Sequence, residues 1–81
     1  MINTLRGKVL SIGEESITLE VAGFGLEVFA SRSLILNAEM SEELFCYAYM
    51  QLSDAGVSLF GFSDERERLL FLELVQVKTV G

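Results

Sequence analysis

Short runs of alternating apolar and polar residues, separated by turns, constrain most of this chain to β-structure. The clearest run is Ser16–Val21, in which every second residue is aliphatic. Ile17, Leu19 and Val21 therefore share one face of a strand, and the pattern predicts that this face is buried. Four further runs predict strands at residues 5–12, 26–29, 44–50 and 57–62.

The links between these runs predict how the strands are joined. Residues 13–15 and 22–25 are short turns, so the first three strands form a meander. Residues 31–40 interrupt the pattern, and the serines at their start cap a short helical turn. A helical insert between the third and fourth of five strands predicts a mainly β fold, a five-stranded OB-type Greek-key barrel. An SH3-like barrel and a small open sheet fit the same strand count.

A helical period follows the last strand. Asp64 and Glu67 have the spacing of a capping box at its start. Apolar residues then recur at helical intervals, at Leu69, Leu70, Phe71, Leu72, Leu74 and Val77. The sequence therefore predicts one C-terminal helix from about residue 64 to 77, with part of its apolar surface packed on the barrel or on another partner.

Composition limits what so short a chain does. Of its 81 residues, 51% are hydrophobic, and a domain of this size buries only about 60% of its unfolded surface. Apolar surface is therefore expected to remain exposed, which predicts an oligomer or a neighbouring domain. Six basic and twelve acidic residues give a net charge of −6, which counts against phosphate binding by these residues alone.

Catalytic chemistry has few candidate groups here. The chain has no histidine, the commonest general base and metal ligand, and its one cysteine, Cys46, lies inside an apolar run. We therefore expect Cys46 to be structural and the protein to be no enzyme, with no cofactor and no metal. The acidic pairs Glu14-Glu15 and Glu42-Glu43 are interpreted as solvated turn residues, since a metal site needs several converging ligands.

The cellular compartment is predicted from cysteine usage and from the apolar segments. A single cysteine forms no intrachain disulfide, which fits a reducing compartment. The N-terminus lacks the basic and apolar regions of a signal peptide, and the longest apolar runs are far shorter than the ~20 residues of a membrane span. We expect a cytoplasmic protein.

Two segments are candidates for binding. Asp54 is the one acidic residue at the tip of a predicted hairpin over residues 53–56, where an ordinary turn is the simpler interpretation. The second segment follows the predicted helix and consists of Lys78, Thr79, Val80 and Gly81. It fits equally a helix C-cap and the opening of a helix-hairpin-helix loop, whose backbone amides bind phosphate.

Several short segments, taken in order along the whole chain, match one known pattern. They are Met1-Ile2, Leu5-Arg6-Gly7, Glu20-Val21, Gly23-Phe24-Gly25-Leu26-Glu27-Val28, Leu59-Phe60-Gly61-Phe62, Glu67-Arg68, Leu70-Phe71, Leu74 and Val80-Gly81. In order and spacing these segments resemble the N-terminal part of RuvA, a family of bacterial Holliday-junction-binding proteins. The resemblance covers this whole chain but only the first part of a full-length family member.

The resemblance implies an OB-fold domain over residues 1–63 and, over residues 64–81, the first helix and start of a helix-hairpin-helix domain that is cut at Gly81. It also implies a mobile third domain outside this chain that contacts the motor ATPase RuvB, with the resolvase RuvC as a further candidate partner. Family members form homotetramers that hold four-way junction DNA open while the motor drives branch migration in recombination and repair. Most DNA-binding basic groups are then expected outside this acidic segment.

Within this resemblance, Asp54 is the candidate for an acidic pin at the centre of the junction. The family usually has two adjacent carboxylates there, which repel phosphates and keep the arms apart, whereas here Asp54 is followed by Ala55. Four copies bring about four negative charges to the centre instead of about eight, so the expected repulsion is weaker. The resemblance makes residues 78–81 the start of the first phosphate-binding hairpin, with Thr79 at the first glycine position of the family's loop.

Two other interpretations are open. An acidic OB-fold module that mediates oligomerisation and protein interaction, without nucleic-acid binding, fits the charge of this chain. An OB domain that binds single strands needs aromatic side chains on an exposed basic face, whereas most aromatic residues here lie at core-like positions.

Overall fold

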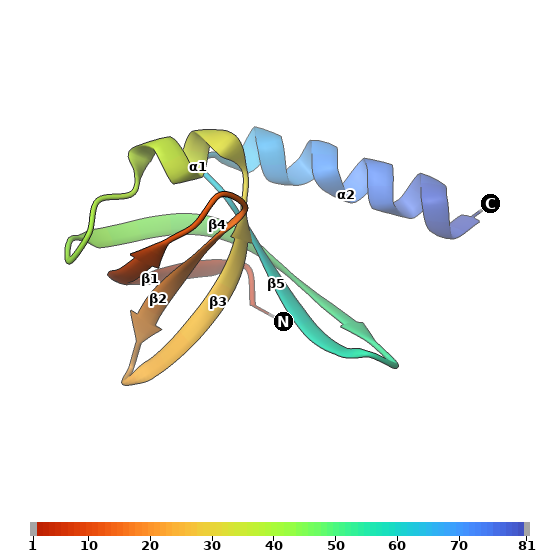
Figure 1. The fold of residues 1–81 in the computed structure, drawn as a ribbon. Helices are drawn as coiled ribbons and strands as arrows, with labels where there is room; N and C mark the ends of the chain where they lie inside the picture. The colour runs from red at the N-terminus through yellow and green to blue at the C-terminus, as the bar shows by residue number, and fades with distance from the viewer. Residues whose placement is uncertain (1, 81) are drawn as a thin grey trace.

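Strands fill most of the first sixty residues, and a long helix follows them. The computed structural model describes the backbone of residues 2–80 and the side chains of residues 2–75. The elements in chain order are β1 (Thr4–Ile12), β2 (Ser16–Val21), β3 (Phe24–Ala30), α1 (Arg32–Asn37), β4 (Glu43–Ser53), β5 (Gly56–Phe62) and α2 (Glu65–Val80). In Figure 1, α1 lies over one end of the strands and α2 runs outward from that end.

The five strands close into a barrel in the order β1-β2-β3-β5-β4. Neighbouring strands are antiparallel except β3 and β5, which are parallel and pair through Phe29↔Phe60 and Ala30↔Gly61. α1 connects β3 to β4, and its Leu34 is buried. Barrel closure excludes the small open sheet, so the predicted five-stranded barrel with a C-terminal helix is confirmed.

Aliphatic side chains and one cysteine fill the barrel interior. The largest of those with almost no exposed surface are Val9, Ile17, Leu19, Val28, Leu34 and Cys46. In β2 the predicted alternation is confirmed for Ile17 and Leu19, whereas Val21 at the end of the strand is only half-buried. Cys46 is a structural cysteine as expected, and burial raises the pKa of its thiol to about 11.

Two strands extend beyond the predicted runs by two residues or more at one end. Ala22 and Gly23 both have a positive φ, 52° and 87°, which is the backbone of a two-residue type I′ turn. β3 therefore starts at Phe24 instead of residue 26. β4 likewise continues to Ser53, past the expected end at residue 50, because it pairs with β5 as far as Gly56.

α2 begins where the capping pattern places it and ends later than predicted. The Glu67 amide donates to Asp64 Oδ1 at 2.9 Å, which caps the helix. The helix continues to Val80 instead of residue 77, since no glycine or proline interrupts it. Of the residues predicted to open a hairpin, Lys78, Thr79 and Val80 have helical backbone, with side chains outside the described residues, and Gly81 lies outside them altogether.

Only part of the predicted apolar stripe of α2 faces the barrel. Phe71 packs on Phe60 with 5.0 Å between ring centroids. Three leucines of the stripe are instead more than half exposed: Leu69, Leu70 and Leu74. Phe71 shares a helix face with Glu67 and Arg68, whose polar side chains bind the rest of the domain, and Leu69 and Leu70 lie off this face. Neither helix in the described part of the chain is long and apolar enough to cross a bilayer.

Candidate nucleic-acid interface

The β4–β5 hairpin extends beyond the barrel wall as a two-stranded ribbon. β1 pairs with β4 only as far as Tyr47, and β3 pairs with β5 only at Phe60 and Gly61. From there to the turn the two strands pair only with each other, and the last pair is Ser53↔Gly56. In Figure 1 the ribbon projects away from the other strands.

Asp54 lies at the tip of this ribbon, in a turn with Ala55. Ser53 holds the turn, since its Oγ accepts the N–H of Ala55 at 3.2 Å. Gly56 has a φ of 123°, a conformation that residues with a Cβ rarely adopt, so the first residue of β5 has to be glycine. Asp54 is exposed, so its side chain meets solvent at the tip of the hairpin.

The ribbon is uncharged except at its tip. Asp54 is the only charged residue between Glu43 and Asp64. Beside the turn, Leu52 and Val57 are 62% and 63% exposed. A phosphate that approaches the tip meets a negative charge with no cation on the same hairpin, so this end of the domain repels a nucleic-acid backbone.

Two of the basic residues are held in contacts within the domain. Arg6 pairs with Glu43 at 3.6 Å and lies over the ring of Phe45, 4.9 Å from its centroid. Arg68 Nε donates to the carbonyl oxygen of Ala48 at 2.7 Å. The chain as a whole has a net charge of −6, which disfavours strong attraction of phosphate by this segment.

One carboxylate ties the start of α2 to the start of α1. Glu67 Oε2 accepts from Ser33 Oγ at 2.8 Å, while Oε1 accepts from Ser63 Oγ at 2.9 Å and from Ser31 Oγ at 3.2 Å. The amide of Ser63 donates to Oε1 at 3.1 Å. These hydrogen bonds, above all the one from Ser33, hold the pKa of the Glu67 carboxyl below its usual 4.5.

Sequence reasoning identified Glu67 but not its partners. The capping-box spacing predicts that its side chain bonds the amide of Asp64, whereas the carboxylate reaches Ser63, one residue earlier. Ser31 and Ser33 precede Glu67 by 36 and 34 residues, so no local pattern pairs them with it. The one available signal was the pair of serines predicted to cap the short helix, of which Ser31 is the cap and accepts the Leu34 amide at 3.3 Å.

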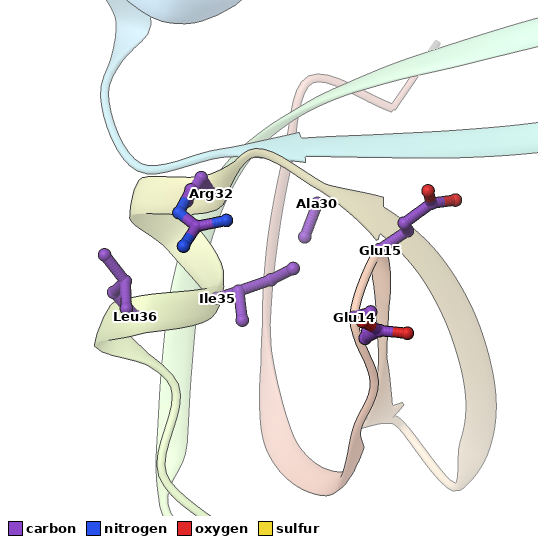
Figure 2. Close-up of a pocket in the computed structure, with 6 residues that line it drawn as sticks. All are labelled: Glu14, Glu15, Ala30, Arg32, Ile35 and Leu36. Carbon is purple, nitrogen blue, oxygen red and sulfur yellow. The ribbon is translucent and has the colours of Figure 1, made fainter.

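A groove of about 380 Å³ opens between α1 and the β1–β2 turn. In Figure 2, Arg32 and Ile35 line it on α1, and Glu14, Glu15 and Ala30 line it from β3 and the turn. The two glutamates are exposed, as expected for turn residues. Carboxylates and a guanidinium share this groove, and within the described residues no three His, Cys, Asp or Glu side chains converge as a metal site requires.

A family model and several curated relatives point to one family. The model described as RuvA N terminal domain matches residues 1–61. Relatives similar over the whole chain include proteins of Bdellovibrio bacteriovorus (34% identical), Desulforudis audaxviator (35%) and Chloroflexus aurantiacus (39%), each named Holliday junction branch migration complex subunit RuvA. The chain spans only 41–42% of the length of these relatives. The barrel with its protruding hairpin therefore corresponds to the family's N-terminal domain, and the chain belongs to the RuvA family.

Proposed function

We propose that this chain is the N-terminal hub of a Holliday-junction-binding scaffold subunit, which acts in recombination and DNA repair and has no active site of its own. Membership of the RuvA family supports this proposal, as does the name that its relatives carry. The proposal keeps residues 1–63 as an OB-fold domain and assigns residues 64–81 to the start of a helix-hairpin-helix domain. Such a subunit works in the cytoplasm, where the bacterial chromosome lies.

The observation that carries the proposal is a lone carboxylate at the end of an otherwise uncharged ribbon. We place Asp54 at the centre of the junction, where the four arms bring phosphates close together. A negative charge at that point raises the energy of any arrangement that crowds phosphates there, so it favours an open junction. Because the barrel is acidic overall, the attraction that holds DNA comes from other parts of the assembly.

Assembly as a homotetramer is part of the proposal. Five large apolar side chains in the described part are more than 60% exposed: Phe24, Leu36, Leu52, Val57 and Leu74. Surface of this kind on a small domain supports contact with further copies or domains. Light scattering of the chain in solution measures this directly, and a mass of four copies is the expected result, whereas a monomer at all concentrations means that the barrel does not carry assembly.

The remaining partners follow from the same family relationship. We propose that Lys78, Thr79, Val80 and Gly81 lead into a phosphate-binding hairpin, at the end of α2. Recruitment of the RuvB motor is assigned to a further domain beyond this chain, and RuvC resolvase is a candidate for binding the same junction complex. No cofactor or metal is needed for this role, since the work is binding and electrostatic repulsion.

Junction preference tests the proposed function. In a fusion, this chain replaces the matching N-terminal segment of the Chloroflexus aurantiacus relative, which is 39% identical to it. The fusion is titrated, at one fixed salt concentration, against a four-way junction and against a duplex of the same sequence. Tighter binding to the junction is expected, with the unaltered relative as control. Equal binding to both DNAs by the fusion contradicts the proposal.

A protein-interaction module without DNA binding is the second candidate function. The net charge of −6 and the exposed apolar side chains favour it for the chain acting alone. The two functions separate in the fusion experiment, because an interaction module assembles but gives no preference for the junction.

A further inference from the structure

We propose that Glu67 is a positioning residue, whose carboxylate gathers serine hydroxyls from two distant parts of the chain and thereby fixes the direction in which α2 leaves the barrel. Ser31 and Ser33 stand at the start of α1, while Ser63 lies between β5 and α2. All three donate to the same carboxylate, at distances of 2.8 to 3.2 Å. The first turn of α2 is thus bonded to the element that caps the barrel end.

The number of protons explains why a carboxylate is needed at this position. The three hydroxyls have one proton each, and besides their bonds to Glu67 their oxygens approach one another, at 2.7 Å for Ser33 with Ser63 and 3.3 Å for Ser31 with Ser33. A group that only accepts can receive all of these protons, together with the Ser63 amide proton. A side chain without this acceptor leaves part-buried hydroxyls to compete for one another, which costs free energy.

Capping of α2 does not account for this cluster. Asp64 already caps the helix by accepting the Glu67 amide at 2.9 Å. The Glu67 carboxylate instead accepts hydrogen bonds from Ser63, which precedes α2, and from the two serines at the start of α1. Its role is therefore to join α2 to the rest of the domain, beyond the start of the helix itself.

Two neighbouring contacts on the same face of α2 complete the joint. Arg68 donates from Nε to the Ala48 carbonyl at 2.7 Å and from a terminal nitrogen to Asn3 Oδ1 at 3.1 Å. One turn later Phe71 packs against Phe60 and Tyr49, with ring centroids 5.0 and 6.0 Å apart. Further along the helix Leu74 is 64% exposed. These contacts lie in the first two turns of α2. They therefore set the angle at which the rest of the helix leaves the barrel.

The length of α2 makes this angle important. At about 1.5 Å per residue, the helix extends roughly 20 Å from Glu67 to Val80, so a swing of about 15° at the joint moves its far end by roughly 5 Å. The consequence for DNA rests on the proposed function, since α2 leads to the proposed phosphate-binding residues while Asp54 marks the proposed junction centre. Glu67 then sets the spacing between the attractive and the repulsive part of the subunit.

A distance measurement within the chain tests the joint without DNA. Spin labels are attached at Lys8→Cys on β1 and Glu73→Cys on α2, two exposed positions, while the buried Cys46 stays unlabelled. Pulsed electron resonance then gives the distribution of label distances. A narrow distribution is expected for this labelled parent. For Glu67→Ala, the distribution should broaden or shift by roughly 2 Å, because residue 73 lies only about 9 Å along the helix from Glu67.

Matched variants keep the test decisive. Glu65→Ala removes the other acidic residue from the first turn of α2, and it is expected to leave the distribution unchanged. Ser33→Ala removes the shortest hydrogen bond to the carboxylate. It is expected to change the distance distribution in the same way as Glu67→Ala. NMR spectra of the backbone amides in the barrel strands show whether each variant is folded. If Glu67→Ala unfolds the barrel, the distance distribution of Ser33→Ala tests the proposal. A distribution as narrow as that of the parent in folded Glu67→Ala and Ser33→Ala overturns the proposal, whatever the DNA affinity is.

Discussion

Arg68 and Ala48 are joined by a 2.7 Å hydrogen bond from the guanidinium Nε to the main-chain carbonyl oxygen. Ala48 follows the last residue of β4 that pairs with β1, and its own amide donates to Asn3 O at 2.7 Å. The base of the protruding hairpin and the start of α2 are therefore fixed at one residue. Any movement of α2 relative to the tip of the hairpin has to break or bend this contact.

Loss of this contact is expected to destabilise the domain. Arg68→Ala removes a charge-assisted hydrogen bond to a carbonyl, which contributes about 1.5 to 3 kcal/mol. Urea denaturation gives the free energy of unfolding, with Arg66→Ala, an exposed arginine in the same turn, as the matched control. Equal losses in the two variants show that the Arg68 contact adds nothing to stability.

Gly61 is expected to tolerate no side chain. A Cβ at this position meets Val28 Cγ1 at 2.8 Å and Leu34 Cδ2 at 2.9 Å, both in the core. Gly61→Ala should therefore lower the free energy of unfolding by about 1 to 3 kcal/mol through overpacking. At Gly25, by contrast, the nearest atom is 3.8 Å away, so Gly25→Ala is the control and is expected to fold normally. Thermal melts of both variants compare them, and a stable Gly61→Ala contradicts the packing described for the barrel end.

The Cys46 thiol is expected to be unreactive in the folded protein. Burial raises its pKa from 9.0 to about 11, so the neutral thiol predominates at pH 8 and no reagent reaches it. A disulfide reagent at pH 8 should modify Cys46 only after urea unfolds the chain. Since the unfolded thiol ionises first, stability should also fall as the pH rises from 9.0 toward 11. Rapid modification under native conditions contradicts the burial of this residue.

Acid is expected to loosen the joint at Glu67. Its folded-state pKa lies below the usual 4.5, so its contribution to stability is complete above that value and is lost as the pH falls through the folded pKa. The chemical shift of the Ser63 amide, which donates to Glu67, follows this titration by NMR. Ser33→Ala removes the largest contribution and should move the midpoint upward, toward 4.5. A midpoint that Ser33→Ala leaves unchanged contradicts the assignment of the shift to that hydroxyl.

The isolated chain is expected to bind a four-way junction far more weakly than the fusion that supplies the remaining domains. Its net charge of −6 repels phosphate, and two of its arginines are held in internal contacts. Gel-shift titrations of both proteins at the same salt concentration compare them directly. Equal affinities show that the barrel alone carries DNA binding.

The barrel was predictable from sequence because its strands follow local rules. Alternation in β2 correctly places Ile17 and Leu19 in the core, since side chains on a strand point to opposite faces in turn. The exact ends of β3 and β4 were not predictable, because they depend on turn geometry at Ala22 and Gly23 and on pairing with β5. Local pattern therefore identifies a strand, whereas its partner decides its length.

The α2 face and the joint were beyond sequence reasoning for a different reason. Apolar periodicity marks Leu70 and Leu74 as strongly as Phe71, yet only Phe71 packs on the barrel. Glu67 and Arg68 help to choose the face, and their partners outside the start of α2 lie 20 to 65 residues earlier in the chain. Polar contacts between residues so far apart in the chain produce no periodic pattern in the sequence. The place of Asp54 on a turn was evident from its neighbours, while its isolation at the end of a free ribbon required the strand pairing.

The most direct test of the account is the ratio of junction affinity to duplex affinity, measured in the fusion with and without the Asp54 charge. Asp54→Asn keeps the turn but removes the negative charge from the hairpin tip, while Glu14→Gln removes an exposed charge from another turn as the control. Loss of phosphate repulsion at the centre should reduce the preference for the junction on the order of threefold to tenfold in Asp54→Asn. An unchanged ratio in Asp54→Asn, or an equal reduction in Glu14→Gln, contradicts the role of the hairpin tip at the junction centre.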